Sequence, residues 1–184
     1  MDSKKKKIVV LDVNGVCQEV IKLNFNPYAL TVRNGHLFVT GKKKIRKRKW
    51  NPIFWTKNLS TGVSGFCDVG GDRGNYLYGS WSITVDGENG TSENLYTLHR
   101  GNIAKLPLNG GGTGNYCVDD STQYHTHGVA GTSTTHAYAT QIEMDSDSDD
   151  YIYLTTGTTN QIAKYEITAT TGNNKLSETW KRGT

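Results

Sequence analysis

A stretch of sequence that occurs twice constrains the fold of this chain more than any other feature. Residues 102–111 are NIAKLPLNGG and residues 160–172 are NQIAKYEITATTG, so Asn, Ile-Ala-Lys and a run containing glycine recur. Upstream, three further pairs of residues align: Ile142 with Ile83, Met144 with Val85 and Asp145 with Asp86. An internal repeat is decisive because every copy should form the same supersecondary unit.

A third copy of the repeat lies earlier in the chain. Residues 29–41, ALTVRNGHLFVTG, contain the same apolar run, Asn-Gly turn and second apolar run, and residues 53–62, IFWTKNLSTG, continue it. The period is roughly 50 to 60 residues. This period lies at or just above the ~40–50 residues that are typical of propeller blades.

Each copy has the same order of strands and turns. An alternating apolar strand is followed by a turn rich in Asn, Asp, Gly or Ser, a second strand, a loop, a third strand and a turn with Gly. Alternation at period two with such turns predicts strands joined as hairpins, and we expect almost no helix. A weaker fourth strand contains Cys17, Cys67 or Cys117, spaced 50 residues apart, and residues 175–180 would form it in the last copy.

Four antiparallel strands in each repeat predict an all-β fold built from propeller-like blades. The best copy, MDSDSDDYIYLTTGTTNQIAKYE at residues 144–166, resembles the NHL-like and related β-propellers, whose blades follow a pattern close to V-D-x-x-G-x-I-Y-V-T-x-x-x-x-N-x-I-x-K. The resemblance extends over nearly the whole chain. It implies a blade fold and a binding surface, and it carries over no catalytic residue.

The repeats predict a single propeller-like region over residues 1–184 that does not close as a ring. We expect a half blade at 5–24 and blades at 28–69, 76–119 and 137–182. Closed propellers usually have ~4–8 blades, so the chain is predicted to be an incomplete ring or part of a larger propeller. Other protein chains or further blades of the same protein would then cover its ends, and we expect the isolated chain to associate.

The cysteines and the N-terminus bear on the location of the protein. Three cysteines in equivalent strands of different blades do not predict a disulfide framework, and we expect them to be small buried hydrophobes. No cleavage pattern follows the N-terminal MDSKKKK, so we expect no signal peptide. No run approaches the ~20 apolar residues of a membrane span. A virion or extracellular location and a cytoplasmic one both stay open.

Positive charge is concentrated in two short segments. Residues 4–7 and 42–49 contain eleven of the 21 basic residues, which leaves ten basic against 17 acidic residues, a balance of −7, in the rest of the chain. The larger segment lies between the second and third strands of a blade and is predicted to be an exposed loop on one rim. We expect it to contact a polyanion or the acidic surface of a partner through Lys42, Lys43, Lys44, Arg46, Lys47, Arg48, Lys49 and Trp50.

Two chemistries fit this basic segment. Its cations would release counterions from phosphates and bind nucleic acid with little base specificity. Trp50, Phe54 and Trp55 follow closely and could stack on bases or sugars. The alternative is a solvated loop or a contact with a neighbouring subunit, and a nuclear localisation segment is a third interpretation.

Three histidines form a weaker candidate site for a metal ion. His125, His127 and His136 lie between a fourth strand and the next first strand. If that stretch is extended, His125 and His127 share one face and could bind zinc with a third ligand. Their spacing matches no recognised zinc pattern, so a polar surface loop is the alternative, and we expect no cofactor beyond this metal.

The sequence favours a non-enzymatic binding or assembly module, such as a structural component of a virion or an extracellular assembly. It contains no Gly-x-Ser-x-Gly motif and no phosphate-binding glycine loop. The first alternative is a fragment of a propeller enzyme, of a lyase or hydrolase type, with its site over the central channel. The second is a polyanion-binding or nucleic-acid-binding module that uses residues 42–49.

Overall fold

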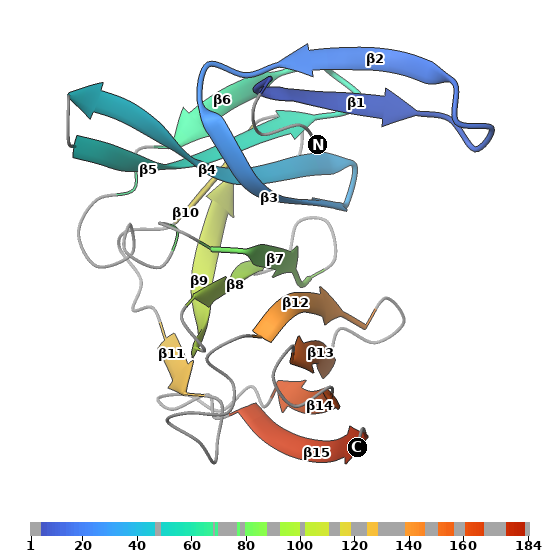
Figure 1. Ribbon diagram of the computed structural model, residues 1–184, viewed down its shortest axis with the longest axis vertical. Helices are drawn as coiled ribbons and strands as arrows, with labels where there is room; N and C mark the ends of the chain where they lie inside the picture. The colour runs from blue at the N-terminus through green and yellow to red at the C-terminus, as the bar shows by residue number, and fades with distance from the viewer. Residues whose placement is uncertain are drawn as a thin grey trace.

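The computed structural model of the chain is all-β (Figure 1). It describes residues 5–46, 49–67, 69, 77, 80–87, 93–99, 102–110, 115–118, 125–128, 139–145, 151–156, 161–167 and 176–182. Within these ranges no helix has the length and apolar character needed to cross a membrane. The predicted all-β class with small antiparallel sheets is confirmed, whereas the assignment of these sheets to propeller blades stays a prediction.

The strands form one hairpin and three larger antiparallel sheets. The hairpin pairs β1 (Lys7–Leu11) with β2 (Cys17–Lys22). The first sheet has the order β3 (Asn26–Arg33), β4 (His36–Arg46), β5 (Lys49–Asn58) and β6 (Ser64–Cys67). The second has β7 (Ser82–Val85), β8 (Asn94–His99), β9 (Asn102–Gly110) and β10 (Tyr116–Val118). The third has β12 (Ala139–Met144), β13 (Tyr151–Thr156), β14 (Gln161–Ile167) and β15 (Leu176–Arg182).

One further strand lies in a segment that was predicted to be a loop. β11 (His125–Gly128) pairs antiparallel with the first half of β9, with His125 opposite Lys105 and Gly128 opposite Asn102. The second half of β9 pairs with β10 instead. The long β9 therefore has room for two short partners on one edge, and the backbone of β11 satisfies donors and acceptors that would otherwise be unpaired.

The turn between β3 and β4 follows directly from its sequence. Asn34 and Gly35 both have positive φ, 49° and 71°, which is the backbone of a two-residue hairpin turn. Asn and Gly are favoured there because the left-handed region costs them least. The Asn34 side chain then donates to the Gly87 carbonyl at 2.8 Å and to Glu93 Oε1 at 2.7 Å. A turn of the first sheet is thereby bonded to the turn between β7 and β8 of the second.

The apolar core consists of three clusters, each between consecutive sheets. The first cluster joins the β1–β2 hairpin to the first sheet through Ile8, Ile21, Leu23, Phe25, Leu37, Val39 and Trp55. The second joins the first and second sheets around Phe38, Phe54, Leu95 and Leu106. The third joins the second and third sheets around Tyr96, Leu98, Ile142 and Ile152. Strand alternation explains this pattern, because successive side chains point to opposite faces.

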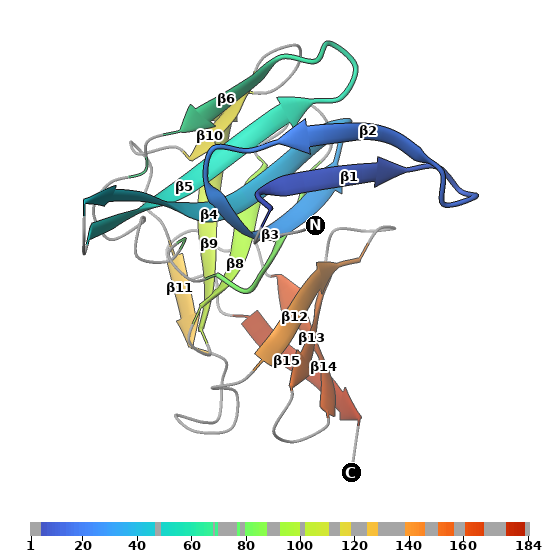
Figure 2. The ribbon, with the colours of Figure 1, turned by 45° about the horizontal axis from the view of Figure 1, so that its top comes forward.

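The first strands of the three sheets lie side by side. β3 contacts β7, and β7 contacts β12, so these strands follow one another down the molecule (Figures 1 and 2). Hydroxyl groups join β7 to β12: Ser82 Oγ donates to the Ile142 carbonyl at 3.3 Å and accepts from its N–H at 3.1 Å. Thr84 Oγ1 accepts from the Met144 N–H at 3.2 Å. The side chains of β7 thus supply hydrogen bonds across a gap that backbone pairing does not bridge.

All three cysteines contradict the expectation from the sequence. Cys67 of β6 and Cys117 of β10 form a disulfide with their Cα atoms 5.3 Å apart. Equal spacing places the two cysteines in equivalent fourth strands, and β6 and β10 contact each other where the first and second sheets pack. Cys17 is a free cysteine and is exposed, so the prediction of a buried hydrophobe is wrong for it as well.

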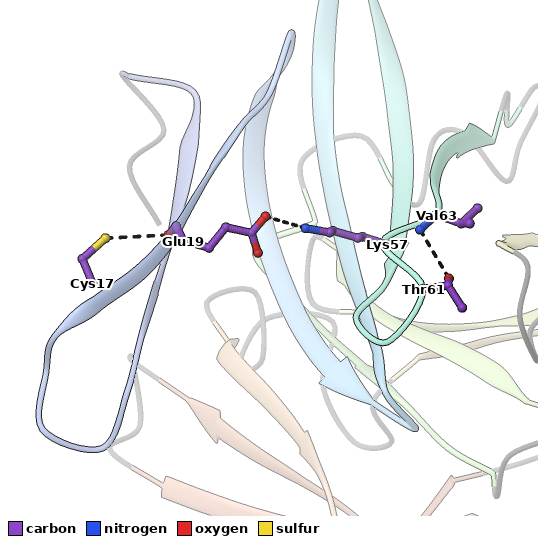
Figure 3. A network of polar contacts seen from close by, with 5 residues as sticks. All are labelled: Cys17, Glu19, Lys57, Thr61 and Val63. Atoms are coloured by element: carbon purple, nitrogen blue, oxygen red, sulfur yellow. Dashed lines mark hydrogen bonds and ion pairs between the residues drawn. The ribbon is translucent and has the colours of Figure 1, made fainter.

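The β1–β2 hairpin is held against the first sheet by polar contacts as well as by its core cluster (Figure 3). Lys57 Nζ of β5 and Glu19 Oε1 of β2 form an ion pair at 2.6 Å. The Lys57 side chain is 15 % exposed and the Glu19 side chain 49 %, so solvent screens this pair and it contributes little stability. Burial of Ile8 and Ile21 is the larger contribution, and it positions the N-terminal segment beside β4.

Candidate polyanion-binding site

The basic segment forms the end of a long hairpin and not a rim loop as predicted. Residues 42–46 belong to β4, and residues 49 and 50 belong to β5. The ladder pairs Lys42 with Pro52, Lys44 with Trp50 and Arg46 with Lys49, with an irregularity between Lys44 and Arg46. Backbone pairing does not depend on side-chain charge, so it continues through the cationic run. The hairpin extends beyond the other strands of its sheet in both views (Figures 1 and 2).

Side chains of the predicted site residues are described for only part of this hairpin. Lys43 and Lys44 are exposed, whereas Lys42 and Trp50 are half-buried. Lys47 and Arg48, together with the side chains of Arg46 and Lys49, lie outside the described residues. The site is therefore built here from the side chains that remain.

A pocket of about 320 Å³ lies against the outer half of this hairpin, beside Lys42 to Lys44 and Trp50. Four lysines line it: Lys6, Lys42, Lys43 and Lys44. The remaining lining residues are Asn24, Phe25, Asn26 and Trp50. Among these described residues none is acidic, so the pocket offers ammonium and amide donors without a carboxylate to oppose an anion.

Aromatic rings hold two of the lysines in place. Lys42 Nζ lies 4.6 Å from the centroid of the Trp50 ring and 5.1 Å from that of Tyr28. Lys44 Nζ lies 5.9 Å from the Trp50 centroid. Such cation–π contacts contribute about 0.5–1 kcal/mol each at exposed sites. They fix the ammonium groups near the pocket instead of leaving them to extend into solvent.

Tight backbone packing forms the wall of the pocket between β3 and β4. A Cβ on Gly41 would lie 2.7 Å from the Phe25 ring and would also clash with the Asn26 carbonyl. Glycine is therefore required next to Lys42, because any side chain would displace two lining residues. Lys6 completes the wall from the N-terminal segment, where its carbonyl accepts from the Leu23 N–H at 2.8 Å.

Lys6 has an unfavourable backbone conformation for its residue type. Its φ is 51°, in the left-handed region that costs most non-glycine residues about 1–2 kcal/mol. A strained residue persists only where its surroundings hold it. The hydrogen bond from Leu23 and the packing of β1 do so here, and they bring the Lys6 ammonium to the same pocket as the cations of β4.

Half of the residues that line the pocket belong to the set predicted from the sequence. Lys42, Lys43, Lys44 and Trp50 line the pocket as members of the predicted set, while Lys6, Asn24, Phe25 and Asn26 were missed. Phe54 and Trp55, which were expected to follow as stacking residues, are 0 % and 7 % exposed and belong to two core clusters. The second basic segment, residues 4–7, was the only sequence signal that could have indicated Lys6.

The predicted metal site remains untested. The backbone of His125 and His127 is extended in β11, but their side chains and all of His136 lie outside the described residues. Within the part of the chain that the structure describes, no group of three His, Cys, Asp or Glu side chains could hold a metal ion. The zinc hypothesis stays a prediction from the sequence.

A buried carboxylate forms a second polar centre, in the second sheet. Asp86 Oδ2 accepts from the Tyr96 hydroxyl at 2.6 Å, and Asp86 Oδ1 accepts from the Asn94 N–H at 2.6 Å. Burial raises the pKa of Asp86, and the hydrogen bonds from Tyr96 and Asn94 and the charge of Lys105 offset that rise in part. Burial lowers the pKa of Lys105, while the charge of Asp86 opposes the change. These groups are hydrogen-bonded to or charged against one another.

Another buried polar cluster lies between the first and second sheets. His36 Nδ1 lies 2.9 Å from the Asn34 carbonyl, and the Asn58 amide nitrogen lies 3.1 Å from His36 Nε2. The His36 ring packs edge-on against Tyr116 at 4.7 Å. Burial, and then the nearby carboxylate of Glu93, raise the pKa of Tyr116. All these side chains are enclosed between sheets, so the cluster stabilises the packing and offers no access to a ligand.

The lysine-lined pocket is thus a candidate site for an anion among the described residues. Comparison of the sequence with models of known protein families and with curated proteins finds no match.

Proposed function

We propose that this protein is a non-enzymatic binding module that holds a polyanion at the end of the β4–β5 hairpin. One observation carries the proposal: four lysines from two distant segments line a single pocket that has no acidic residue among its described walls. A cluster of cations in one place is unfavourable unless an anion or a charged partner compensates it. The remainder of the chain has a balance of −7, so this cationic surface is distinct from the body.

We also propose that the sheets are blades of a propeller-like arrangement. Three features support this: each large sheet contains a four-strand meander, the core lies between consecutive sheets, and the first strands β3, β7 and β12 are neighbours. Radial packing of four-stranded sheets is the propeller architecture. The resemblance to NHL-like propellers and the incomplete ring remain parts of this proposal.

The enzyme alternative has no comparable support. A propeller enzyme would need titratable side chains with access to substrate, and Asp86 and Glu93 are 8 % and 3 % exposed and bonded to their neighbours. Assembly with an acidic partner uses the same cations as polyanion binding, so experiment must separate those two.

The test compares matched double variants that each remove two positive charges. Lys43→Ser with Lys44→Ser removes two exposed lining cations, and Lys7→Ser with Lys22→Ser removes an opposing pair on the β1–β2 hairpin that does not line the pocket. Binding of heparin, single-stranded DNA and poly-glutamate is measured by fluorescence anisotropy between 50 and 300 mM salt. We expect the first variant to lower affinity and reduce the log–log salt slope by about 1–2, since each lost contact to a phosphate of a single strand contributes roughly 0.7.

The control variant should bind like the parent. Equal losses in both variants would indicate a general charge effect and contradict the proposed site. Binding of poly-glutamate in preference to both other chains would instead favour an acidic protein partner over a phosphate or sulfate chain.

A further inference from the structure

We propose that the pocket beside the outer half of the β4–β5 hairpin is a site for a compact ligand with two or more linked phosphate groups. The inference rests on the proposed polyanion-binding function and specifies its ligand class. It distinguishes clustered phosphates, as in an inorganic triphosphate or the phosphate tail of a nucleotide, from phosphates spread along an extended chain.

The balance of charge and volume supports clustered phosphates. Lys6, Lys42, Lys43 and Lys44 all line a pocket of about 320 Å³. Ligand pockets span roughly 300–1,000 Å³, so this one holds only a small group. A single phosphate has a charge of about −1.5 to −2 at neutral pH, which is smaller than the formal charge of these four lysines. Two or three linked phosphates bring more negative charge into the same small volume.

The contacts that the Trp50 ring already makes argue against recognition of a base or sugar ring by this residue. Lys42 and Lys44 already lie over this ring, with their Nζ atoms 4.6 and 5.9 Å from its centroid. The ring face is therefore in contact with the two lysines, and it holds them where they can contact an anion. The other two aromatic residues that follow in the sequence are in the core. A nucleotide would therefore be held by its phosphates, with its base outside the pocket.

The donors are arranged before a ligand arrives. The Asn26 backbone pairs with Lys42 in the β3–β4 ladder. The register of this ladder therefore positions both the Asn26 side chain and the Lys42 side chain. Lys6 is fixed by its hydrogen bond with Leu23 in a conformation that is strained for lysine. Preorganised donors raise affinity because less conformational entropy is lost on binding. Strain at a lysine that lines a cationic pocket is typical of a functional position.

Lys6→Gly gives a sharp test because glycine adopts positive φ without strain. The variant removes one lining ammonium and keeps the backbone conformation and the Leu23 hydrogen bond. Titration calorimetry with inorganic triphosphate, orthophosphate and a nucleoside triphosphate, in EDTA without magnesium and at 150 mM salt, measures affinity. We expect triphosphate to bind the parent at least tenfold more tightly than orthophosphate, and Lys6→Gly to bind it at least fivefold more weakly without a fall in melting temperature.

Tryptophan fluorescence gives a second readout at the site. Anions that draw Lys42 and Lys44 away from the Trp50 ring should change its emission, and Trp50→Phe should abolish that change. The inorganic and nucleoside triphosphates should bind alike, and bases should not be distinguished.

Three outcomes would overturn the inference. They are triphosphate binding no tighter than orthophosphate, an unchanged affinity in Lys6→Gly, and a nucleoside triphosphate that binds far more tightly than the inorganic form because of its base. If heparin binding still depends on Lys43 and Lys44 in that case, the proposed polyanion function stands and only the compact-phosphate inference fails.

Discussion

The residues shared by the repeats make hydrogen bonds and ring contacts within the sheets. Tyr96 donates to Asp86 and has Lys105 Nζ 5.8 Å from its ring centroid, and these are the Asp, Tyr and Lys of the repeated motif. In the third sheet the equivalent residues are Asp145, Tyr153 and Lys164. Tyr153 Oη lies 3.5 Å from Asp145 Oδ2, and Lys164 Nζ lies 5.6 Å from the Tyr153 ring. The recurring Ile-Ala-Lys therefore belongs to a packing unit that is similar in the two sheets.

The raised pKa of Asp86 predicts how the stability of the protein depends on pH. Burial raises its pKa in the folded protein, so the folded state favours protonated Asp86 more than the unfolded state does. The associated stability is present below the ordinary pKa of 3.8 and is lost as pH rises through the raised folded-state value. We expect the melting temperature of the parent, relative to Asp86→Asn, to fall between pH 3.5 and neutrality.

Thermal unfolding of both proteins at half-unit pH steps measures this difference. Glu143→Gln is the matched control, because Glu143 is exposed. A parent that becomes more stable than Asp86→Asn as pH rises would contradict the sign.

At the scale of single elements, local patterns predicted the strands better than the site. Alternating residues and the Asn-Gly turn identify β3 and β4 because the causes are local: side-chain period and positive φ. The prediction of a loop for the basic run was wrong, because the run was placed between the second and third strands of a blade. In the structure, backbone pairing continues and Trp50 accommodates the lysines beside it.

Substitutions of Asn34 test how the β3–β4 turn joins the first and second sheets. Asn34→Gly keeps the positive φ but loses the hydrogen bonds to the Gly87 carbonyl and Glu93. We expect it to lower the free energy of unfolding by about 1–3 kcal/mol, since a partly buried acceptor and a buried carboxylate lose a donor. Asn34→Ala loses the same bonds and adds left-handed strain of about 1–2 kcal/mol.

Urea unfolding of the two variants separates these contributions. If Asn34→Gly matched the parent, the side chain would not join the sheets. If alanine and glycine were equal, the turn would carry no strain.

At the scale of the whole molecule, the sequence could not place Lys6 beside Lys42. Lys6 precedes β1 and Lys42 lies in β4, and they meet because Ile8 and Ile21 bury the β1–β2 hairpin against the first sheet. Periodicity predicts which residues form strands but not which sheets will pack. The same limitation explains the cysteines, whose equal spacing was visible but whose proximity depends on the packing of the first and second sheets.

The outer face of the third sheet bears on association. Ile142 and Met144 face the core, while the alternate residues Gln141 and Glu143 are exposed. A partner chain or further blade at this end, which the repeat count predicts, would meet these polar side chains and the exposed Ile162. We expect such an association to weaken with salt, in contrast to one driven by apolar burial.

The disulfide joins two sheets that otherwise meet through side chains. Cys67 and Cys117 are 50 residues apart, and closing a loop of this size stabilises a protein by roughly 2–4 kcal/mol. Disulfides persist mainly in oxidising compartments. We therefore expect the native fold to be reached most efficiently in an oxidising compartment, which fits the extracellular or virion alternative better than the cytoplasmic one.

Removal of this disulfide should destabilise the packed sheets. Cys67→Ser with Cys117→Ser should lower the melting temperature by on the order of 5–15 °C, because 1 kcal/mol corresponds to about 2–4 °C in a domain of this size. Reductant should lower the parent to the level of the variant and leave the variant unchanged. Cys17→Ser is the matched control, since Cys17 is free and exposed and should melt like the parent. Thiol titration in denaturant provides the direct check: one thiol per chain is expected without reductant, and three thiols would show that the two sheets are not covalently joined.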